Sequence, residues 1–578
     1  MLDGINFKTI WWSLVHVVLS NNLIHIIWCA GILIFMIVLA VLHHKWKFDY
    51  GKKMLLWRFL CLIPLAAAGA HYMLYLKGCD TDIVSSFTPL YAIGVLALIP
   101  IPFANRTVGY RLTATLTGLI CVLSGLVFAA SSPQFYNYSD KSYSESFSAM
   151  VKTMERTYVL KDWKDADLAE LEKKYMPLVK EAEKKNDALM FGEAVTQFCN
   201  ELHDGHIVVQ YDRSSEKDRD FGMGLVKLDN GDVIAVCTSA EANEKGIKDG
   251  TVITEWNGKP VLQAAEEDVK DDGSPVKANG DILSVIKLAV EGGATVEVSF
   301  IDEDGEEQTV TLYDLIDNEE DAKKHHCAMD AYNLFRHAPD KDTEEAENFS
   351  TKMLDDKCGY ILVNEEATEN GLHDLAGYFN GDHKWAREMF REKLKDLKSQ
   401  GMEYLVIDLR NNEGGNDEIG FALVDLLTKD PQFGLNVGMR WKDGYKPLAD
   451  HGIKGDGEFA DLKVVALTNF NCGSAGDSLA QALGDLPNVT LMGMTDPNGC
   501  NQETGGMMKL AGGDVTVYYP TGIVLDEKGE PNIDTKADRI SRDPVEERIP
   551  LDHDAAMKLF VDKEDYELSK AVEFLKGQ

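Results

Sequence analysis

Four long apolar segments fill most of the first 131 residues, and this feature constrains the fold more than any other. They are residues 23–42, 59–76, 83–103 and 112–130. Each is close to the roughly 20 residues that a helix needs to cross the hydrocarbon core of a bilayer. A signal peptide would account for only one of them, and no early cleavage-like site is present. The sequence therefore predicts a four-helix transmembrane region over residues 1–131.

The basic residues predict the orientation of these helices. Lys and Arg gather in the loops at 43–53 and 104–111, whereas the loop between them holds one Lys and two Asp. Basic loops remain on the cytoplasmic side of a membrane. An even number of spans then leaves the chain after residue 131 on the outer face. We therefore expect a multi-pass protein of the cell membrane, in contact with lipid, whose large remaining part is extracytoplasmic.

The charge of that remaining part narrows the range of partners. The whole chain of 578 residues has a formal net charge of −36, although residues 1–135 carry nine Lys and Arg against four Asp. The acidic excess therefore lies entirely after the membrane region. Because such a surface repels phosphate backbones, the composition argues against nucleic acid as a partner.

Residue patterns divide the rest of the chain into regions. Apolar residues at helical spacing, among them Phe191, Val195 and Phe198, predict a helical region before residue 217. Short alternating strands with Gly and Asp-Gly turns follow it. Continuous apolar runs at 404–409 and 463–468 then predict strands of a sheet covered on both faces. The predicted regions are a linker (132–147), a helical cap (148–217), a β-rich module (218–315), a charged connector (316–355) and an α/β core (356–578).

Three short islands carry the residue types of acyl-transfer chemistry. They are "ELHDGHIVVQ" with His206, "VIDLRNNEGGNDE" with a Gly-rich turn, and "VVALTNFNCGSAGDSLAQAL" with Ser474. A serine needs a base to accept its proton, and an oxyanion needs fixed backbone amides, which Gly turns can present. Taken singly, each has a plainer interpretation: a helix N-cap for Ser474, a packed or surface histidine for His206, and an ordinary turn for the Gly-rich island.

Together with "GYILV", these islands resemble the C-terminal processing peptidase and tricorn core protease family of serine peptidases. The family has an Asp-Leu-Arg-x-Asn-x-Gly-Gly turn and a nucleophile turn followed by a short strand that ends in Gly. The resemblance gives Ser474 the nucleophile position and Gly493 the end of the strand. It implies a multidomain architecture in the order helical cap, PDZ-like module and α/β core of the ClpP/crotonase type.

The positions at which this sequence departs from the family pattern indicate which branch of the family it resembles. The processing peptidases use a lysine 25 residues after the serine, and Gly499 stands there with no lysine nearby. Tricorn-like members use a histidine before the PDZ region, so the resemblance gives the base role to His206. Their serine before that histidine is replaced here by Gly205. The tetrad of those enzymes is therefore not fully reproduced.

The resemblance also implies the groups that assist Ser474 and His206. Tricorn-like members orient the histidine with a carboxylate, and the matching stretch "DRISRDP" supplies Asp538, with Asp534 as a competitor. The backbone amides of Gly415 and Ala475 would form the oxyanion hole. Arg410 and Asn412 are expected to hold that turn rather than to react. No metal and no organic cofactor is implied.

The β-rich module resembles a PDZ domain. In that fold, a Gly-rich turn binds a chain-terminal carboxylate while a strand edge pairs with an extended peptide. The residues that match the turn are Phe221, Gly222, Met223 and Gly224. An ordinary β-rich spacer is the alternative interpretation.

A cysteine pair follows from the same alignment with the family. Cys472 lies two residues before Ser474, and Cys500 follows the position where related enzymes bring a lysine to the serine. If the fold holds, the two sulfur atoms are neighbours. Outside the cytoplasm they could form a disulfide, and buried free thiols are the alternative.

The sequence thus predicts a membrane-anchored serine endopeptidase that cleaves protein or peptide substrates on the outer face. The alternative is a peptide-binding or scaffold protein that keeps the fold without turnover. A transporter is a weaker interpretation, because the apolar segments hold few polar residues beyond His25 and His71. Nothing in the sequence indicates the oligomeric state.

Overall fold

The computed structural model describes most of the chain after residue 133. The described residues are 134–213, 219–270, 273–337, 348–367, 384–441, 444–534 and 545–577, with isolated residues between 27 and 70. The predicted spans at 23–42 and 59–76 lie largely, and those at 83–103 and 112–130 wholly, outside them. Among the described residues, none of the helices has the length and apolar character needed to cross a bilayer.

The chain divides into two units. One comprises residues 1–137 and 505–508, and the other comprises residues 138–504 and 509–578. The only complete element described in residues 1–137 is β1 (Gln134–Asn137). All the candidate site residues that are described belong to the second unit, to which the rest of the description applies.

A sheet in the order β18-β15-β14-β11-β10-β9 forms the centre of the second unit. All neighbouring strands run parallel except β9, which is antiparallel to β10. Its strands are β9 (Phe349–Met353), β10 (Cys358–Val363), β11 (Tyr404–Asp408), β14 (Lys463–Leu467), β15 (Val489–Gly493) and β18 (Glu547–Arg548). The apolar runs predicted as buried strands are β11 and β14, and the "GYILV" segment lies in β10.

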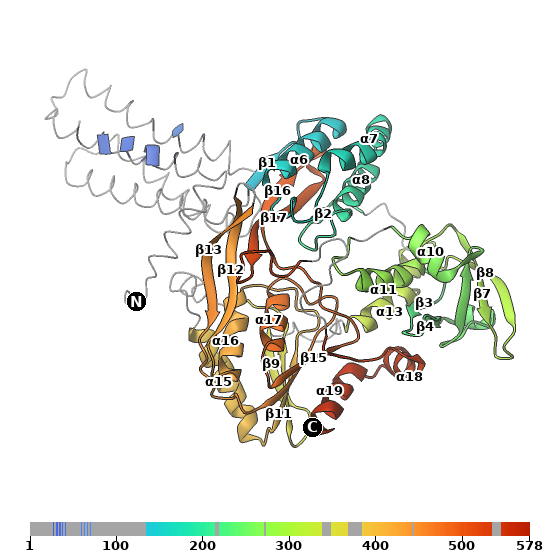
Figure 1. Ribbon diagram of the computed structural model, residues 1–578. Coiled ribbons are helices and arrows are strands. Elements are labelled where there is room, and N and C mark those ends of the chain that lie inside the picture. Colours follow the sequence, from blue (N-terminus) through green and yellow to red (C-terminus); the bar gives the residue numbers. More distant parts are fainter. Residues whose placement is uncertain are drawn as a thin grey trace. The chain divides into compact units, whose positions relative to one another are not determined.

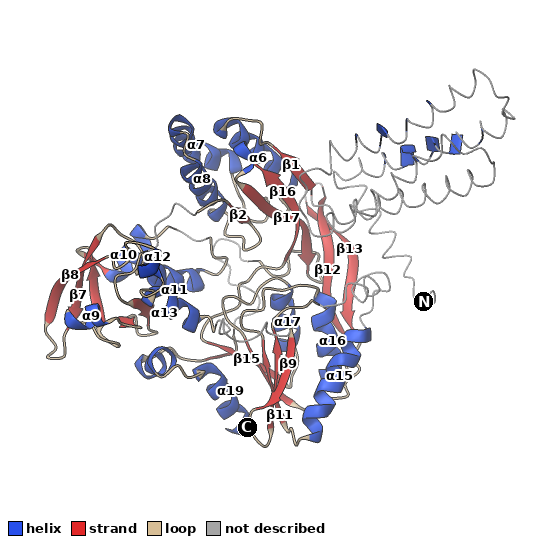
Figure 2. Cartoon of the chain, turned by 180° about the vertical axis from the view of Figure 1, so that it is seen from behind, coloured by secondary structure: helices blue, strands red, loops and turns tan. Residues whose placement is uncertain are grey.

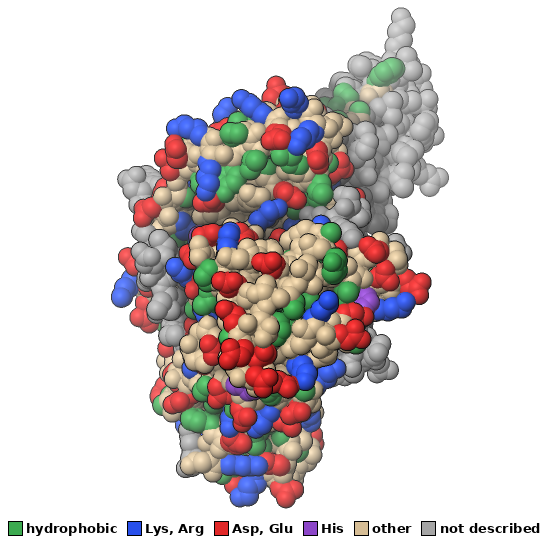
Figure 3. All heavy atoms as spheres, turned by 90° about the vertical axis from the view of Figure 1, so that its right-hand side faces the viewer, with side chains coloured by type: hydrophobic (Ala, Val, Ile, Leu, Met, Phe, Trp, Pro, Cys, Tyr) green, Lys and Arg blue, Asp and Glu red, His purple; other side chains and the backbone are tan. Residues whose placement is uncertain are grey.

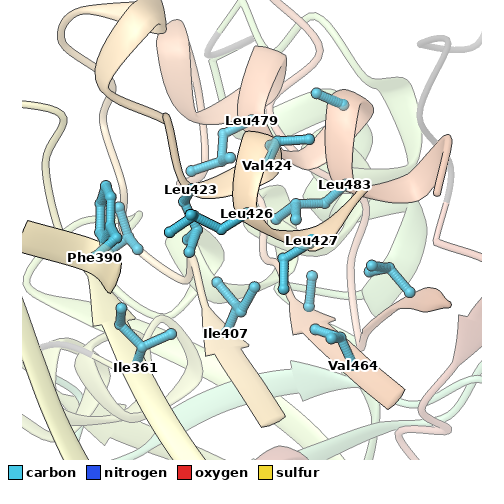
Figure 4. Close-up of a cluster of buried hydrophobic side chains, with 14 of the residues drawn as sticks. Ile361, Phe390, Ile407, Leu423, Val424, Leu426, Leu427, Val464, Leu479 and Leu483 are labelled. Carbon is cyan, nitrogen blue, oxygen red and sulfur yellow. The ribbon is translucent and has the colours of Figure 1, made fainter. Parts of the chain in front are cut away.

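Helices cover both faces of this sheet, which explains the continuous apolar runs. On one face, α15 (Lys384–Ser399), α16 (Asp417–Leu427) and α17 (Ala475–Gly484) pack on the strands (Figures 2 and 4). Phe390 of α15 and Leu423 of α16 are fully buried there against Ile407 of β11. The other face carries α19 (Tyr566–Gly577), preceded by α18 (His553–Ala556) and a π-helical turn (Met557–Val561).

The predicted cap consists of helices beside a second sheet. The helices are α6 (Tyr143–Thr157), α7 (Leu168–Lys185) and α8 (Ala188–Asn200), and Ser142 begins the first of them with a capping box. The strands of this sheet that lie wholly in the second unit are β17 (Thr516–Leu525), β12 (Gln432–Trp441) and β13 (Gly444–Ile453), with β2 (Val208–Gln210) paired to β17. The residues of β16 (Gln502–Lys509) are divided between the two units. Because β2 directly follows the "LHDGH" turn, this pairing ties the turn to the core of the second unit.

The β-rich module has its own sheet and its own core (Figure 1). Its strands are β3 (Gly224–Lys227), β4 (Val233–Val236), β5 (Val252–Trp256), β6 (Lys259–Pro260), β7 (Thr295–Ile301) and β8 (Glu307–Tyr313). Its helices are α9 (Ala240–Glu244), α10 (Val261–Asp268) and α11 (Lys277–Leu288). Trp256 and Phe221 contact each other edge to face inside this core.

The described parts of the predicted connector, 316–337 and 348–355, contain regular secondary structure. They contain α12 (Glu319–Ala322), α13 (Cys327–Phe335) and strand β9. The buried residues of α13 are Ala328, Ala331 and Phe335. Ala331 and Phe335 lie in one hydrophobic cluster with residues of β3, β4 and the central sheet, whereas Ala328 lies in the core of the β-rich module. This helix therefore packs the β-rich module onto the core. On the face shown in Figure 3, acidic and basic side chains are interleaved.

Candidate active site

Ser474 stands at the sharp turn between the loop after β14 and helix α17. Its backbone has φ 57° and ψ −126°, a region that residues other than Gly rarely adopt. It occupies the N-cap position, but its side chain makes no capping hydrogen bond. The plainer interpretation of Ser474 as a helix cap is therefore not what the structure shows. Strained backbone of this kind is often found at functional sites.

His206 approaches Ser474 from the turn after α8. Its Nε2 lies 3.0 Å from the Ser474 Oγ, although 268 positions separate the two residues in sequence. Asp204 shapes the turn: its Oδ1 accepts the His206 backbone N–H at 2.9 Å, and its Oδ2 accepts the Tyr158 hydroxyl at 2.8 Å. The structure thus brings the predicted nucleophile and base into hydrogen-bonding distance.

The environment of His206 favours its neutral form. Burial lowers the pKa of the imidazole, and the nearby Asp204 carboxylate opposes this effect. A neutral imidazole that accepts a proton at Nε2 carries its hydrogen on Nδ1. The Nδ1 atom is buried and has no hydrogen-bond partner among the described residues. Asp538, the predicted orienting carboxylate, lies at 535–544, outside those residues.

Asp534, the competing carboxylate, is buried behind the same turn. Its Oδ1 pairs with the Lys164 Nζ at 2.8 Å, and Lys164 also donates to the His203 carbonyl oxygen at 2.7 Å. Burial raises the pKa of Asp534 to about 7 against the lowering effect of Lys164. Within the described part of the chain, no hydrogen bond joins Asp534 to His206. Its observed contacts therefore support the turn rather than the imidazole ring.

The Gly-rich turn after β11 lies directly against Ser474. A Cβ atom built on Gly414 would lie 2.5 Å from the Ser474 Cβ and 2.8 Å from the Ala475 N. The predicted oxyanion amides, those of Gly415 and Ala475, donate no hydrogen bond in the described residues. Two unoccupied N–H groups beside a serine hydroxyl can receive a developing negative charge.

Arg410 and Asn412 hold this turn, as expected. The Arg410 guanidinium is buried, where it pairs with Asp408, Asp565 and Glu567. The Asn412 Oδ1 accepts the Gly414 N–H at 2.9 Å, and its backbone carbonyl accepts the Gly473 N–H at 2.9 Å. Asn412 thus links the Gly-rich turn to the nucleophile turn.

Sequence reasoning missed Glu366. This residue follows β10 in the charged run "NEEAT" and is only 1% exposed. Its Oε1 accepts a hydrogen bond from the Asn412 Nδ2 at 2.9 Å. A charged run after a strand is typical of an exposed loop, so no local sequence signal identified it.

A polar cleft of about 540 Å³ opens beside the Gly-rich turn. Its lining consists of Arg336, Asn364, Glu365, Asn411, Glu413, Gly414, Gly415 and Asn471. The Arg336 backbone carbonyl accepts hydrogen bonds from the Asn411 and Asn469 side chains, so the end of α13 is joined to both turns. Within the described residues, no group of three or more His, Cys, Asp or Glu side chains could hold a metal ion.

The predicted peptide-binding turn, Phe221 to Gly224, lies against α13. Phe221 and Met223 are buried, and the Gly222 N–H is bonded to the Asp220 Oδ1 at 2.6 Å. A Cβ built on Gly224 would lie 2.3 Å from the Ala331 Cβ of α13. In this structure, the turn and the start of β3 are therefore covered by the chain itself.

Cys472 and Cys500 are both buried, and no disulfide joins them. Their backbones lie beside the nucleophile: the Ser474 N–H donates to the Cys500 carbonyl at 2.9 Å, and the Asn498 N–H donates to the Cys472 carbonyl at 2.8 Å. The Cys500 thiol donates instead to the Asn498 Oδ1 at 2.8 Å. The two buried thiols match the alternative that the sequence left open.

Comparison with known proteins agrees with this geometry. Residues 357–543 match the sequence model of peptidase family S41. The fold is similar to that of mature CPAF complexed with lactacystin, with a TM-score of 0.51 and 14% identity, over 76% of this chain and 99% of that chain. At this level of identity the likeness shows the fold alone. No curated protein sequence matches the chain.

Two further solved structures align over long stretches. One is the photosystem II D1 C-terminal processing protease, with a TM-score of 0.34 and 17% identity, over 74% of this chain and 99% of that chain. The other is the tricorn protease, with a TM-score of 0.33 and 14% identity, over 75% of this chain and 37% of that chain. Their TM-scores are too low to support an argument about the fold.

Proposed function

We propose that this chain, of which residues 357–543 match the sequence model of peptidase family S41, is a membrane-anchored serine endopeptidase with Ser474 as nucleophile and His206 as general base. The observation that carries the proposal is the 3.0 Å separation between the Ser474 Oγ and the His206 Nε2. Protein or peptide chains are its substrates.

The proposed reaction follows from the positions of these groups. The Ser474 Oγ attacks the peptide carbonyl carbon while its proton passes to the His206 Nε2. The oxygen that becomes negative accepts hydrogen bonds from the N–H groups of Gly415 and Ala475. The protonated His206 then gives its proton to the leaving amine. Water hydrolyses the acyl-enzyme by the same proton transfers in reverse.

The Nδ1 of His206 needs an acceptor in this reaction, because its hydrogen fixes the tautomer and the imidazolium form requires charge stabilisation. We assign this role to Asp538, on the resemblance of "DRISRDP" to the carboxylate-bearing stretch of tricorn-like peptidases. Replacing Asp538 by Asn should lower kcat with little change in KM. If Asp538→Asn retains full kcat, the assignment is wrong.

A fluorophosphonate probe tests the nucleophile directly. The full-length protein should be labelled covalently, and Ser474→Ala should abolish labelling while Ser569→Ala, at an exposed site on α19, leaves it unchanged. His206→Ala should be labelled only weakly. Absence of labelling in the natural protein would contradict the proposal and favour the alternative of a peptide-binding protein without turnover.

Membrane anchoring and the outer-face location form the second part of the proposal. They are supported by the four apolar segments and by the basic loops between them. The protein should remain in membranes washed with alkaline carbonate, and a protease added to intact cells should digest the region after residue 131. Release by carbonate, or protection of that region, would contradict this part.

We further propose that the β-rich module is PDZ-like and captures peptides at Phe221–Gly224. Support comes from the Gly222 turn, with φ +83°, and from the place of β3 at the edge of its sheet. Because Ala331 of α13 lies against Gly224 at the start of β3, capture requires α13 to move away. Ala331→Asp, which disfavours the docked position of α13, should therefore raise the affinity for a peptide with a free C-terminus. An unchanged affinity would remove this part of the proposal.

A further inference from the structure

Glu366 flanks the Gly-rich turn through its backbone. Its N–H donates to the Gly414 carbonyl at 3.0 Å, and its carbonyl accepts the Asn416 N–H at 2.9 Å. A Cβ on Gly415 would lie only 2.5 Å from the Glu366 carbonyl oxygen and 3.0 Å from the Glu366 Cα. The main chain of Glu366 thus contacts the turn on both sides of the proposed oxyanion amide.

The side chain of Glu366 continues this contact toward the nucleophile. Its Oε1 accepts from the Asn412 Nδ2 at 2.9 Å, and the Asn412 Oδ1 accepts from the Gly414 N–H at 2.9 Å. The Asn412 carbonyl then accepts the Gly473 N–H, next to Ser474, at 2.9 Å. A continuous chain of hydrogen bonds therefore runs from the Glu366 carboxyl to both turns of the site.

We infer that Glu366 is a positioning residue, which holds the Gly415 amide and Ser474 in register through Asn412 and does so as a neutral carboxyl group. This inference rests on the proposed function, since it assigns the same turn as the oxyanion site. Glu366 itself touches no reacting atom.

The surroundings of the side chain explain why it is neutral. Its Oε2 is buried without a hydrogen-bond partner in the described residues, so an ionised carboxylate would leave one charged oxygen unsatisfied. The charged groups that act on it, Asp417 of α16 and the neighbouring Glu365, are both acidic. Burial is the largest cause, and together these effects raise the pKa of Glu366 to about 8.

The ionisation of Glu366 determines how the reaction rate should change with pH. Below pH 8 the carboxyl is protonated and carries no charge. Above pH 8 it gains a negative charge beside the Gly415 amide, where the reaction also develops negative charge, and this opposes the transition state. The rate should therefore fall with rising pH, with a slope that approaches about tenfold per pH unit.

The test uses the full-length protein and the pH dependence of its labelling rate by a fluorophosphonate. The natural protein should lose reactivity above pH 8. Glu366→Gln keeps an oxygen acceptor for Asn412 and cannot ionise, so it should react within about threefold of the natural rate at pH 7 and keep that rate above pH 8. Glu365→Gln, the exposed neighbour, removes one of the charges that raise the pKa of Glu366, so the loss of reactivity should remain and should begin at a lower pH.

The outcomes separate this inference from the proposed function. No labelling of the natural protein contradicts the proposed function. If the natural protein is labelled and Glu366→Gln shows the same loss of reactivity above pH 8, the role of Glu366 is overturned and the proposed function stands. If Glu366→Gln does not fold, the infrared spectrum of the natural protein decides. Because Asp534 also has a raised pKa, of about 7, the band is measured in Asp534→Asn as well. A protonated carboxyl band that remains in Asp534→Asn and disappears near pH 8 supports the inference, and the absence of such a band at pH 7 overturns it.

Discussion

Gly414→Ala tests most directly whether the two turns must meet as described. The new Cβ would lie 2.5 Å from the Ser474 Cβ, 2.8 Å from the Ala475 N and 3.0 Å from the Ser474 Oγ. Ordinary contacts between such atoms begin at 3.4 Å. One of the two turns must therefore shift by about 1 Å, and a misplacement of this size costs about 10²-fold in rate.

The substitution also strains the backbone, because Gly414 has φ +105°. Such a conformation costs an Ala residue about 1–3 kcal/mol of folding free energy. Gly305→Ala is the matched control: Gly305 has φ +82° in the hairpin between β7 and β8, and a Cβ there meets no atom within 4 Å. Both variants should lose comparable stability in urea unfolding, but only Gly414→Ala should lose activity.

The assay is the second-order rate of fluorophosphonate labelling, together with hydrolysis of an unfolded protein substrate such as casein. We expect Gly414→Ala to be about 10²-fold slower in both, with a native circular dichroism spectrum. If Gly414→Ala labels within about threefold of the natural rate, the close approach of the turns is not needed for reactivity. The reasoning from the Gly414 contact would then be refuted.

Three further predictions follow from single contacts. The pKa of His206 is lowered from 6.5, so on the acid side the labelling rate should fall only below pH 6.5. Asp204→Asn removes the charge that opposes this shift and should move the fall in rate to still lower pH. A move to higher pH would contradict the assignment of His206 as the base. Gly205→Ser should slow labelling, because its Cβ would lie 2.5 Å from both the Cys500 Sγ and the Asn498 Oδ1. Adding Cys500→Ala removes the first contact and the thiol that donates to Asn498, so part of the rate should return; equal rates in the single and double variants would refute this. Arg410→Met removes the guanidinium that pairs with Asp408, Asp565 and Glu567. The free energy of unfolding in urea should therefore fall by about 3–5 kcal/mol. A loss below about 1 kcal/mol would show that the cluster does not stabilise the fold.

The sequence predicted those parts of the fold whose pattern is local. Strands β11 and β14 appear as continuous apolar runs because both faces of the central sheet are covered. The segment around α13 was missed, because its apolar residues are few and lie in a charged stretch. Only the contact with β3 shows why Ala331 must be small, and that contact joins residues more than 100 positions apart.

The residues of the candidate site also divide into those that the sequence predicted and those that it did not. Ser474, His206 and the Gly-rich turn stand in recognisable motifs, and their convergence was expected from the family resemblance. Glu366 could not be predicted, because its burial depends on how the chain after β10 pairs with the turn after β11. The replacement of a serine by Gly205 was visible, but its physical reason was not. The Cys500 sulfur occupies the space that a side chain would need.

The distance of 268 positions between the histidine and the serine has a consequence for biosynthesis. A nascent chain exposes its proposed general base long before the hydroxyl that this base would activate has been translated. Truncated products therefore hold only one half of the proposed hydrolytic pair. The pair forms only after the late segments of the chain have docked on the early ones.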